Sequence, residues 1–348
     1  MSETPPVVSV VVPVFRSERF VAATIRSVLA QTLRTFELIV VDDGSPDRSI
    51  EICRTFADPR IRYVHQPNRG LAAARNAGIR HARGRYIALL DSDDLWAPEK
   101  LAHQVAHLES LPEVGVSFGY SMFIDENGDR LGGYQMLGKE LTRAADCFVA
   151  NPIGNGSNAM LRAEVFTEER WRDGVRPAAW GCLFDEELRQ AEDFELWLRI
   201  ALLTRWRIAC TPWVLTLYRV HPSSLSADVS AQSRFHRRAI EKVAAYAPRL
   251  VTRYRATGES NMFWYFARNH LLQGKLSDAR RMVVRALGRK PANVSVYQAL
   301  ILVYLALCSV LPAGSHPGLL RWGQRVYGRY QERVIRRRQQ RAMGITRQ

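Results

Sequence analysis

The chain has 348 residues, 47% of them hydrophobic, and it carries a net charge of +15 at pH 7. This length and composition allow one large core or two smaller ones, which excludes wholesale disorder. The charge favours anionic neighbours, namely phosphorylated ligands, nucleic acid or an anionic membrane surface.

Cysteine use and the amino terminus bear on the cellular compartment. The cysteines are odd in number and widely spaced, with no C-x-x-C pair, which argues against a disulfide framework or a zinc site. The apolar run at the amino terminus has no basic start and stops at Pro13, too soon for an export signal. We therefore expect a cytoplasmic protein with reduced thiols. The cysteines are Cys53, Cys147, Cys182, Cys210 and Cys308.

Strands and helices alternate along the first part of the chain. β-branched or apolar runs predict strands, and apolar residues at helical spacing predict helices. Nearly continuous apolar strands that alternate with helices indicate an α/β domain, with a parallel sheet covered on both faces. The predicted strands are 7–15, 36–45, 61–66 and 85–91, and the predicted helices are 18–32, 48–57 and 70–82.

Polar residues follow three of these strands, at 13–16, 42–45 and 91–94. In a parallel sheet, ligands bind in the crevice beyond the carboxyl ends of the strands. We expect the acidic residues there to meet on one edge. Aspartate, glycine and serine are also ordinary turn and helix-capping residues, so the segment 42–45 alone supports either interpretation.

The segment 'DSDD' places Asp91, Asp93 and Asp94 directly after a buried strand. Three carboxylates so close raise each other's pKa unless a cation compensates, and a divalent metal is the simplest one. Mg²⁺ and Mn²⁺ take carboxylate ligands, and Mg²⁺ completes its shell with water and substrate phosphates. The sequence therefore predicts a metal–diphosphate site.

Arginines near these segments can bind phosphate oxygens. Arg69 and Arg75 lie in 'NRGLAAARNAG', and Arg219 lies in 'YRVHPSS'. Each alone is more simply a solvated surface arginine, and together they favour a phosphorylated ligand.

Five segments resemble the family 2 glycosyltransferases, which have the GT-A fold. They follow the order and spacing of that family over residues 7 to about 225. The resemblance implies a nucleoside-diphosphate sugar donor, Mn²⁺ or Mg²⁺, and transfer with inversion to an acceptor hydroxyl. The segments are 'VSVVVPVF', 'FELIVVDDGSPDRS', 'NRGLAAARNAGI', 'GRYIALLDSDD' and 'AEDFELWLRI'.

The same resemblance implies roles for individual residues. Asp93 of the DxD motif would bind the metal, with Asp91 less firmly assigned to the metal or the ribose, and Asp94 supporting them. Asp43 would hydrogen-bond the base, beside Asp42. The full set of implied nucleotide-sugar contacts is Pro13, Phe15, Asp42, Asp43, Arg75, Asp91, Ser92 and Asp93.

Transfer also needs a base near the acceptor hydroxyl. Glu192 and Asp193 begin an apolar helix, and by themselves they are more simply an acidic helix start. The resemblance implies that Asp193 is the base and Glu192 supports it. It also makes His221 a candidate metal or diphosphate ligand, with Arg219 supporting.

Other motifs favour other classes of protein. 'GNGSNA' (154–159) matches a dinucleotide-binding fingerprint, but the segment before it is a poor strand, broken by Pro152. We expect Asn155, Ser157 and Asn158 to border the acceptor or to form a polar loop. No nucleic-acid-binding module is present, and we expect no nucleic-acid partner. A catalytically silent sugar-nucleotide-binding or scaffold protein is the alternative to an enzyme.

The last third of the sequence has a helical pattern. Residues 265–293 predict two helices around Gly274, similar to one tetratricopeptide pair, and 294–311 are apolar. The latter segment can span a membrane, lie on one or pack in a core. Residues 313–348, the Arg-rich tail, carry nine arginines and one acid, which favours an anionic membrane surface.

The expected organisation is a GT-A catalytic domain over 1–228, with a nucleotide-sugar half at about 7–115 and an acceptor half at about 116–228. A helical region (229–293) and an apolar helix with the Arg-rich tail (294–348) follow. We expect a hexosyltransferase that uses a glycan or lipid-linked acceptor in bacterial surface polysaccharide or lipopolysaccharide assembly. It would lie in the cytoplasm or at the inner face of the membrane.

Overall fold

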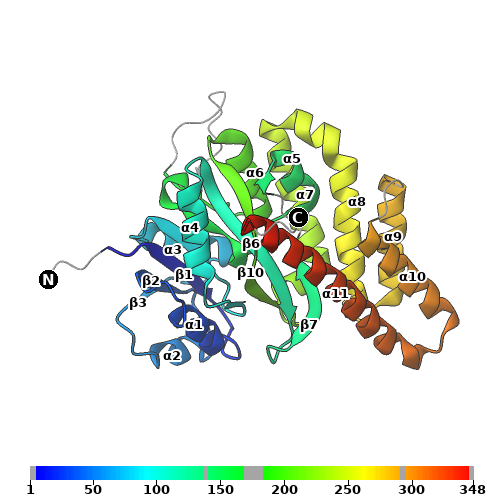
Figure 1. Ribbon diagram of the computed structural model, residues 1–348, viewed down its shortest axis with the longest axis horizontal. Coiled ribbons are helices and arrows are strands. Elements are labelled where there is room, and N and C mark those ends of the chain that lie inside the picture. Colours follow the sequence, from blue (N-terminus) through cyan, green and yellow to red (C-terminus); the bar gives the residue numbers. More distant parts are fainter. Residues whose placement is uncertain (1–4, 137–139, 168–182, 291–294, 345–348) are drawn as a thin grey trace.

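A computed structural model describes residues 5–136, 140–167, 183–290 and 295–344 (Figure 1). Cys182, which we expect to be a reduced thiol, lies outside these residues. The other four cysteines are free and buried. A ten-stranded sheet forms the centre of the molecule, with the order β3-β2-β1-β4-β9-β6-β10-β5, and with β7 beside β6 and β8 beside β10.

The first half of the sheet is parallel. Strand β1 pairs with β2 on one side and with β4 on the other, and β3 extends the sheet beyond β2. The strands form where the sequence predicts them, because their β-branched residues are buried on both faces. The strands are β1 (Val8–Val14), β2 (Phe36–Asp42), β3 (Ile61–His65) and β4 (Tyr86–Leu89). The helices between them are α1 (Val21–Leu29), α2 (Ser49–Arg54) and α3 (Leu71–His81).

The second half of the sheet is mixed. Strand β9 is antiparallel to both β4 and β6 and joins the two halves, whereas β6 and β10 are parallel to each other. The strands are β5 (Leu95–Trp96), β6 (Val114–Ile124), β7 (Arg130–Gln135), β8 (Leu141–Thr142), β9 (Met160–Arg162) and β10 (Arg207–Arg219). The helices are α4 (Lys100–Ser110), α5 (Ala144–Ala150) and α6 (Glu192–Leu203). Short 3₁₀ turns are η1 (Gly156–Asn158), η2 (Ala163–Val165), η4 (Leu225–Ala227) and η5 (Ala313–Ser315).

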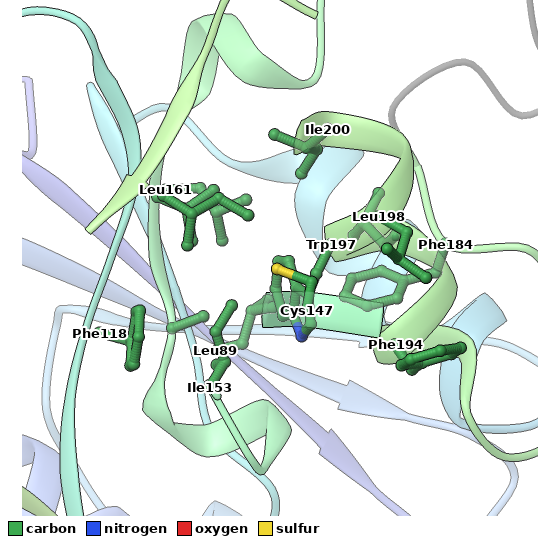
Figure 2. Packing of buried hydrophobic residues seen from close by; sticks show 14 of the residues in the cluster. Leu89, Phe118, Cys147, Ile153, Leu161, Phe184, Phe194, Trp197, Leu198 and Ile200 are labelled. Carbon is green, nitrogen blue, oxygen red and sulfur yellow. The ribbon is translucent and has the colours of Figure 1, made fainter. Parts of the chain in front are cut away.

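Two hydrophobic clusters cover the two faces of the sheet. Alternate residues of β1 belong to different clusters: Val10 and Val12 pack with α1 and α4, and Val11 packs with α3 and α6. Figure 2 shows part of the second cluster, where Phe184, Phe194 and Trp197 lie around Cys147. Helices on both faces of the sheet, as the sequence predicts, make an α/β fold of the GT-A type.

A helical region follows β10. Its helices are α7 (Val229–Tyr246), α8 (Pro248–Leu272), α9 (Leu276–Arg289), α10 (Val296–Val310) and α11 (His316–Ala342). Gly274 turns the chain between α8 and α9 with φ +72°, although α8 begins well before the predicted residue 265. Ile301 and Leu305 of α10 pack on Trp264 and Val283. Among the described residues, no helix has the length and apolarity needed to cross a membrane.

Helix α11 returns across the second half of the sheet (Figure 1). The Gln331 amide binds both backbone groups of Tyr134 in β7: its Oε1 accepts from the N–H at 3.0 Å, and its Nε2 donates to the carbonyl at 2.7 Å. A Cβ on Gly328 would lie 1.9 Å from the Gly132 carbonyl oxygen, so only glycine allows this approach. Most of the Arg-rich tail is therefore a helix docked on the sheet.

Candidate active site

The carboxyl ends of β1, β2 and β4 meet at one edge of the sheet. Val14 at the end of β1 is in register with Asp42 at the end of β2, and Val11 is in register with Leu89 of β4. The polar segments that follow these strands therefore lie together, as their positions in the sequence predict.

Asp43 organises a loop at this edge. Its buried carboxylate accepts hydrogen bonds from the backbone N–H groups of Arg69 and Gly70, both at 2.9 Å, and from the Gln66 amide at 2.7 Å. Asp42 accepts from the N–H of Ser45 and lies 2.9 Å from His65 Nδ1. Both aspartates therefore fix the strand-end loops through contacts within the chain.

The end of β1 presents one aromatic ring to solvent. Pro13 is buried within the strand, whereas Phe15 is 40% exposed, with the Arg16 guanidinium 5.1 Å from its ring centroid. Arg16 has φ +52°, a left-handed conformation that is strained for a non-glycine residue, and its N–H donates to Ser45 Oγ. Phe15 is thus available for stacking, and Pro13 is not.

Arg75 is a buried cation between two segments of the site. Its guanidinium donates to Asp91 after β4 and to Glu192 at the start of α6, with both distances 2.6 Å. A Cβ on Gly156 would lie 2.1 Å from the guanidinium, so glycine makes room for it. Burial raises the pKa of Glu192 to about 7, with a further rise from Asp193 and an opposing effect of Arg75. This carboxyl group therefore titrates near neutral pH.

Asp193 lies next to this ion pair and is only partly buried. Its Oδ1 accepts from the Phe194 N–H at 2.6 Å, while its Oδ2 lies 3.5 Å from the Asn151 amide nitrogen. Burial raises the pKa of Asp193, and Arg75 opposes that rise. Ala191 and Asn151 have φ of +60° and +38°. The residue before α6 and the residue that contacts Asp193 thus both have strained backbone conformations. The contact of Asp193 Oδ2 with Asn151 is long and weak, so this oxygen can accept a further hydrogen bond.

Asp93 and His221 lie side by side, two residues after Asp91 in the chain and just after the end of β10, respectively. The distance from Asp93 Oδ2 to His221 Nε2 is 3.0 Å, and His221 Nδ1 lies 2.8 Å from Ser223 Oγ. The Arg219 guanidinium donates to the Asp93 carbonyl and to the carbonyls of Asp125 and Glu126. The Arg219 guanidinium is therefore occupied by backbone carbonyl groups. The Asp93 side chain is 30% exposed.

Asp94 differs from its two neighbours because it is fully buried. Its carboxyl oxygens accept from the Arg219 N–H at 2.7 Å and from Ser157 Oγ at 2.5 Å. Burial, with Asp93 and Asp91, raises the pKa of Asp94 well above its usual range. The backbone carbonyl of Ser92, also buried, accepts from Thr24 Oγ1. Asp94 and Ser92 thus stabilise the loop 91–94 through buried hydrogen bonds within the chain.

Comparisons with known proteins show which family the chain belongs to. Residues 9–169 match the pattern described as Glycosyl transferase family 2. The glucosyltransferase WfaP of Escherichia coli, named for UDP-Glc and GlcNAc-diphosphoundecaprenol, is 31% identical over 222 residues, which cover 64% of this chain and 80% of WfaP. The chain belongs to glycosyltransferase family 2.

Other relatives in family 2 match over a smaller share of their own length. The uncharacterized glycosyltransferase EpsJ of Bacillus subtilis is 34% identical, over 64% of this chain and 63% of EpsJ. An uncharacterized glycosyltransferase of Rickettsia felis is also 34% identical, over 56% of this chain and 30% of the relative. The matched part is therefore less than two thirds of these two proteins.

Solved structures show the same fold as this family 2 member. Staphylococcus aureus TarS in complex with UDP-GlcNAc has a TM-score of 0.55 and 16% identity, covering 94% of this chain and 92% of TarS. The mannosyltransferase PcManGT of Pyrobaculum calidifontis, in complex with GDP-Man and Mn²⁺, has a TM-score of 0.54 and 20% identity, covering 94% and 87%. At these identities the likeness concerns the fold.

The candidate ligands of this family 2 site suit a divalent cation. Among residues 5–136, 140–167, 183–290 and 295–344, no three acidic, histidine or cysteine side chains form a preformed cluster. Mg²⁺ needs only one or two carboxylates when a diphosphate and water complete its shell. The exposed carboxylate of Asp93 beside His221, with Asp91 adjacent, fits that sparse protein ligand set.

Residues of the segment 'GNGSNA' and Lys100 also build this family 2 site, in contacts that the sequence did not indicate. Ser157 joins the site by accepting from the Asp91 N–H and donating to Asp94, and the buried Lys100 donates to the Asn158 carbonyl. The Asn158 amide binds both backbone groups of Gly119. The segment 'GNGSNA' thus hydrogen-bonds to residues 91–94, which we call the DxD loop. By contrast, the exposed Arg69 side chain binds Glu186.

Proposed function

We propose that the chain transfers a hexose from a nucleoside-diphosphate sugar to an acceptor hydroxyl with inversion at the anomeric carbon. The observation that carries this proposal is the bridge from Arg75 to Asp91 and Glu192. One buried cation ties the DxD loop to the helix that begins with the candidate base. Inversion requires a base on the face opposite the leaving diphosphate, and two separate segments can supply the two sides.

The donor would lie along the strand ends. Phe15 is exposed for stacking on the base, and the loop fixed by Asp42 and Asp43 would border the nucleotide. Asp93 and His221 would hold Mn²⁺ or Mg²⁺, with Asp91 a less firmly assigned ligand. Bound there, the cation supplies positive charge to the departing diphosphate. The presence of Mn²⁺ and GDP-Man in the PcManGT complex supports this assignment.

Asp193 would act as the general base. Its Oδ2 has only the 3.5 Å contact with Asn151, so it can accept the proton of an acceptor hydroxyl. The raised pKa of Asp193 makes it a stronger base than an ordinary aspartate. Glu192 would support it by balancing Arg75, and Asp94, Ser92 and Arg219 would hold the DxD loop.

The name of one relative supports a proposed acceptor and biological setting. The name of WfaP describes transfer to a diphosphoundecaprenol-linked sugar, which supports a lipid-linked or glycan acceptor in bacterial surface polysaccharide or lipopolysaccharide assembly. We assign donor binding to residues 7–115 and acceptor binding to 116–228, within a catalytic domain of 1–228. Residues 229–293 form a helical region.

Residues 294–348 would attach the protein to an anionic membrane surface at its cytoplasmic face. Gly328, Gln331 and Ile335 of α11 are buried against the protein. On its outer side, Trp322, Val326 and Tyr330 are 57%, 43% and 52% exposed, at a spacing of four residues. Exposed arginines flank this row, and aromatic and basic residues together are typical of interfacial helices. These arginines are Arg321, Arg325, Arg329 and Arg333.

A thermal-shift screen tests the proposed reaction class. Nucleotide sugars that carry different bases and sugars would be added with and without Mn²⁺. One donor should raise the melting temperature in a metal-dependent manner, and that donor should then support transfer to lipid-linked sugar acceptors. If no nucleotide sugar stabilises the protein, donor binding is wrong, and a silent scaffold becomes the better interpretation.

A further inference from the structure

A hollow lies in the helical region that follows the sheet. It consists of two adjoining cavities of about 480 and 360 Å³, lined by residues of α7, α8 and α9, which we call the α7–α9 cleft. Both cavities share Arg237, Phe263, Arg285 and Arg289.

The α7–α9 cleft is strongly basic. It is lined by Arg237, Arg255, Arg285 and Arg289 and by one acid, Glu259, which gives a net charge of +3. His236 adds no charge at neutral pH, because burial lowers its pKa to about 4. Four guanidinium groups around one hollow repel each other, and an anion between them removes that repulsion.

The single acid is already shared. Glu259 Oε1 accepts from Arg255 Nε and Oε2 accepts from Arg289 Nε, both at 3.0 Å. Arg237 and Arg285 have no acidic partner among the described residues. The last turn of α9 favours cations, which accounts for Arg289 but not for Arg285 one turn earlier or for Arg237 in the middle of α7. Two guanidinium groups are thus free to bind an anion.

The wall of the α7–α9 cleft is partly apolar. Ile240, Met262 and Phe263 line it together with the arginines. Arginine forks bind phosphate oxygens with paired hydrogen bonds, and an apolar wall suits a hydrocarbon chain. The lining therefore suits a phosphate or diphosphate group, either free or at the head of an apolar molecule.

The cleft also adjoins the helix of the candidate base. His236, which lines the cleft, has its ring centroid 4.5 Å from that of Phe194. The Phe194 N–H donates to Asp193. The His236 ring thus contacts both the α7–α9 cleft and the first turn of α6.

We propose that the α7–α9 cleft binds the diphosphate of an amphiphilic ligand through Arg237 and Arg285. We assign this ligand to the diphosphate-linked acceptor, and that assignment rests on the proposed function. Binding of the diphosphate itself does not depend on it. The cleft thereby gives the helical region a part in substrate selection.

Calorimetric titration of the full chain tests the cleft, with inorganic pyrophosphate and geranyl diphosphate as probes. EDTA is present so that a metal does not recruit either probe to the DxD loop. The double variant R237A/R285A should weaken binding about 10- to 100-fold, as expected for lost charged hydrogen bonds. The matched control is R234A, an exposed arginine on the same helix that does not line the cleft.

The outcomes distinguish a free diphosphate from a diphosphate at the head of an apolar molecule. Tighter binding of geranyl diphosphate than of pyrophosphate supports an amphiphile, and equal affinities support recognition of the diphosphate alone. Absence of binding by both probes, or equal binding by the wild type, R237A/R285A and R234A, overturns the proposal. Because all these arginines are exposed, circular dichroism should show native folding in every variant.

A transfer assay then tests the link to the acceptor. With a diphosphate-linked acceptor, R237A/R285A should raise KM and leave kcat nearly unchanged, while a free sugar acceptor should show no difference between variants. An unchanged KM would remove the acceptor assignment. If the wild type transfers no sugar at all, the proposed function fails, and the calorimetric result still decides whether the cleft binds diphosphate.

Discussion

Asp93 and His221 are 128 residues apart in the chain, yet their Oδ2 and Nε2 atoms lie 3.0 Å apart. The parallel pairing of β6 with β10 and the antiparallel strand β9 bring the end of β10 beside the end of β4. Two side chains that suit a divalent cation thus come from the two halves of the sheet.

Replacing either residue of this pair should weaken metal-dependent nucleotide binding. We expect D93N and H221Q each to reduce the Mn²⁺-dependent affinity for UDP or GDP at least about tenfold, because each removes a ligand or its charge. Titration of the nucleotide with Mn²⁺ or with EDTA measures the effect. D129N, an exposed aspartate in the nearby loop, is the control and should bind as the wild type does. Equal loss in D129N would point to a general charge effect.

The base assignment predicts that D193N separates binding from transfer. Asparagine keeps the size of the side chain and its contact with the Phe194 N–H, but it cannot accept a proton. We expect unchanged donor affinity and a fall in kcat of about 10²- to 10⁴-fold, the usual contribution of a general base. Single-turnover transfer and donor titration give the two values. Wild-type transfer by D193N would rule out this role.

The pH dependence should depend on Glu192. Its pKa of about 7 means that acid converts it to the neutral form, which no longer balances Arg75. The Arg75 charge then acts more strongly on Asp193 and lowers its basicity. We expect kcat/KM to fall by up to about tenfold per pH unit below pH 7. E192Q resembles the protonated form, so its activity should be lower and flat over the same range. An unaltered acid limb in E192Q would contradict this cause.

Asp94 predicts a stability effect with a defined sign. Its folded-state pKa lies well above the unfolded value, so the carboxyl group stabilises the fold below about pH 4 and loses that contribution as pH rises. D94N keeps one acceptor for the Arg219 N–H and does not ionise, so it should gain stability relative to the wild type as pH increases. D94A leaves that buried N–H without a partner and should cost about 1–3 kcal/mol. Urea unfolding in EDTA at pH 4 and pH 8 measures both variants.

The outer row of α11 predicts binding to anionic lipid. W322A/Y330A should bind phosphatidylglycerol vesicles more weakly than the wild type at low salt, because it removes two exposed rings. The control Y63A removes a 41% exposed ring on β3 and should bind as the wild type does. Sedimentation with vesicles compares the three proteins. Failure of the wild type to sediment would exclude this attachment.

Local sequence patterns predicted the part of the site that lies on consecutive elements. β-branched runs located β1, β2 and β4, and because parallel strands end on one edge, the positions of Asp43 and Asp91 followed from strand order. The acidic start of α6 at Asp193 was visible too, since an apolar helix follows it. These features depend on residues close together in the chain.

The remainder of the site depends on distant partners. No periodicity reveals that Ser157 connects Asp91 with Asp94, because this contact joins segments more than sixty residues apart. The sequence predicted Arg75 as a nucleotide contact but not its buried ion pairs, because the pair with Glu192 forms only where α3 and α6 come together. Docking of α11 was equally hidden, since its arginines resemble those of a solvated tail.

The contact of Gln331 with Tyr134 has a consequence for solubility. Strand β7 has β6 as its one partner strand among the described residues, so its other side would present free N–H and C=O groups. Such edges recruit strands from other molecules. A side-chain amide of α11 occupies both backbone groups of Tyr134 and closes the edge at that point. Truncation before α11 should therefore produce a protein that aggregates through β7. Helix α11 thus protects the edge of the sheet from pairing with strands of other molecules.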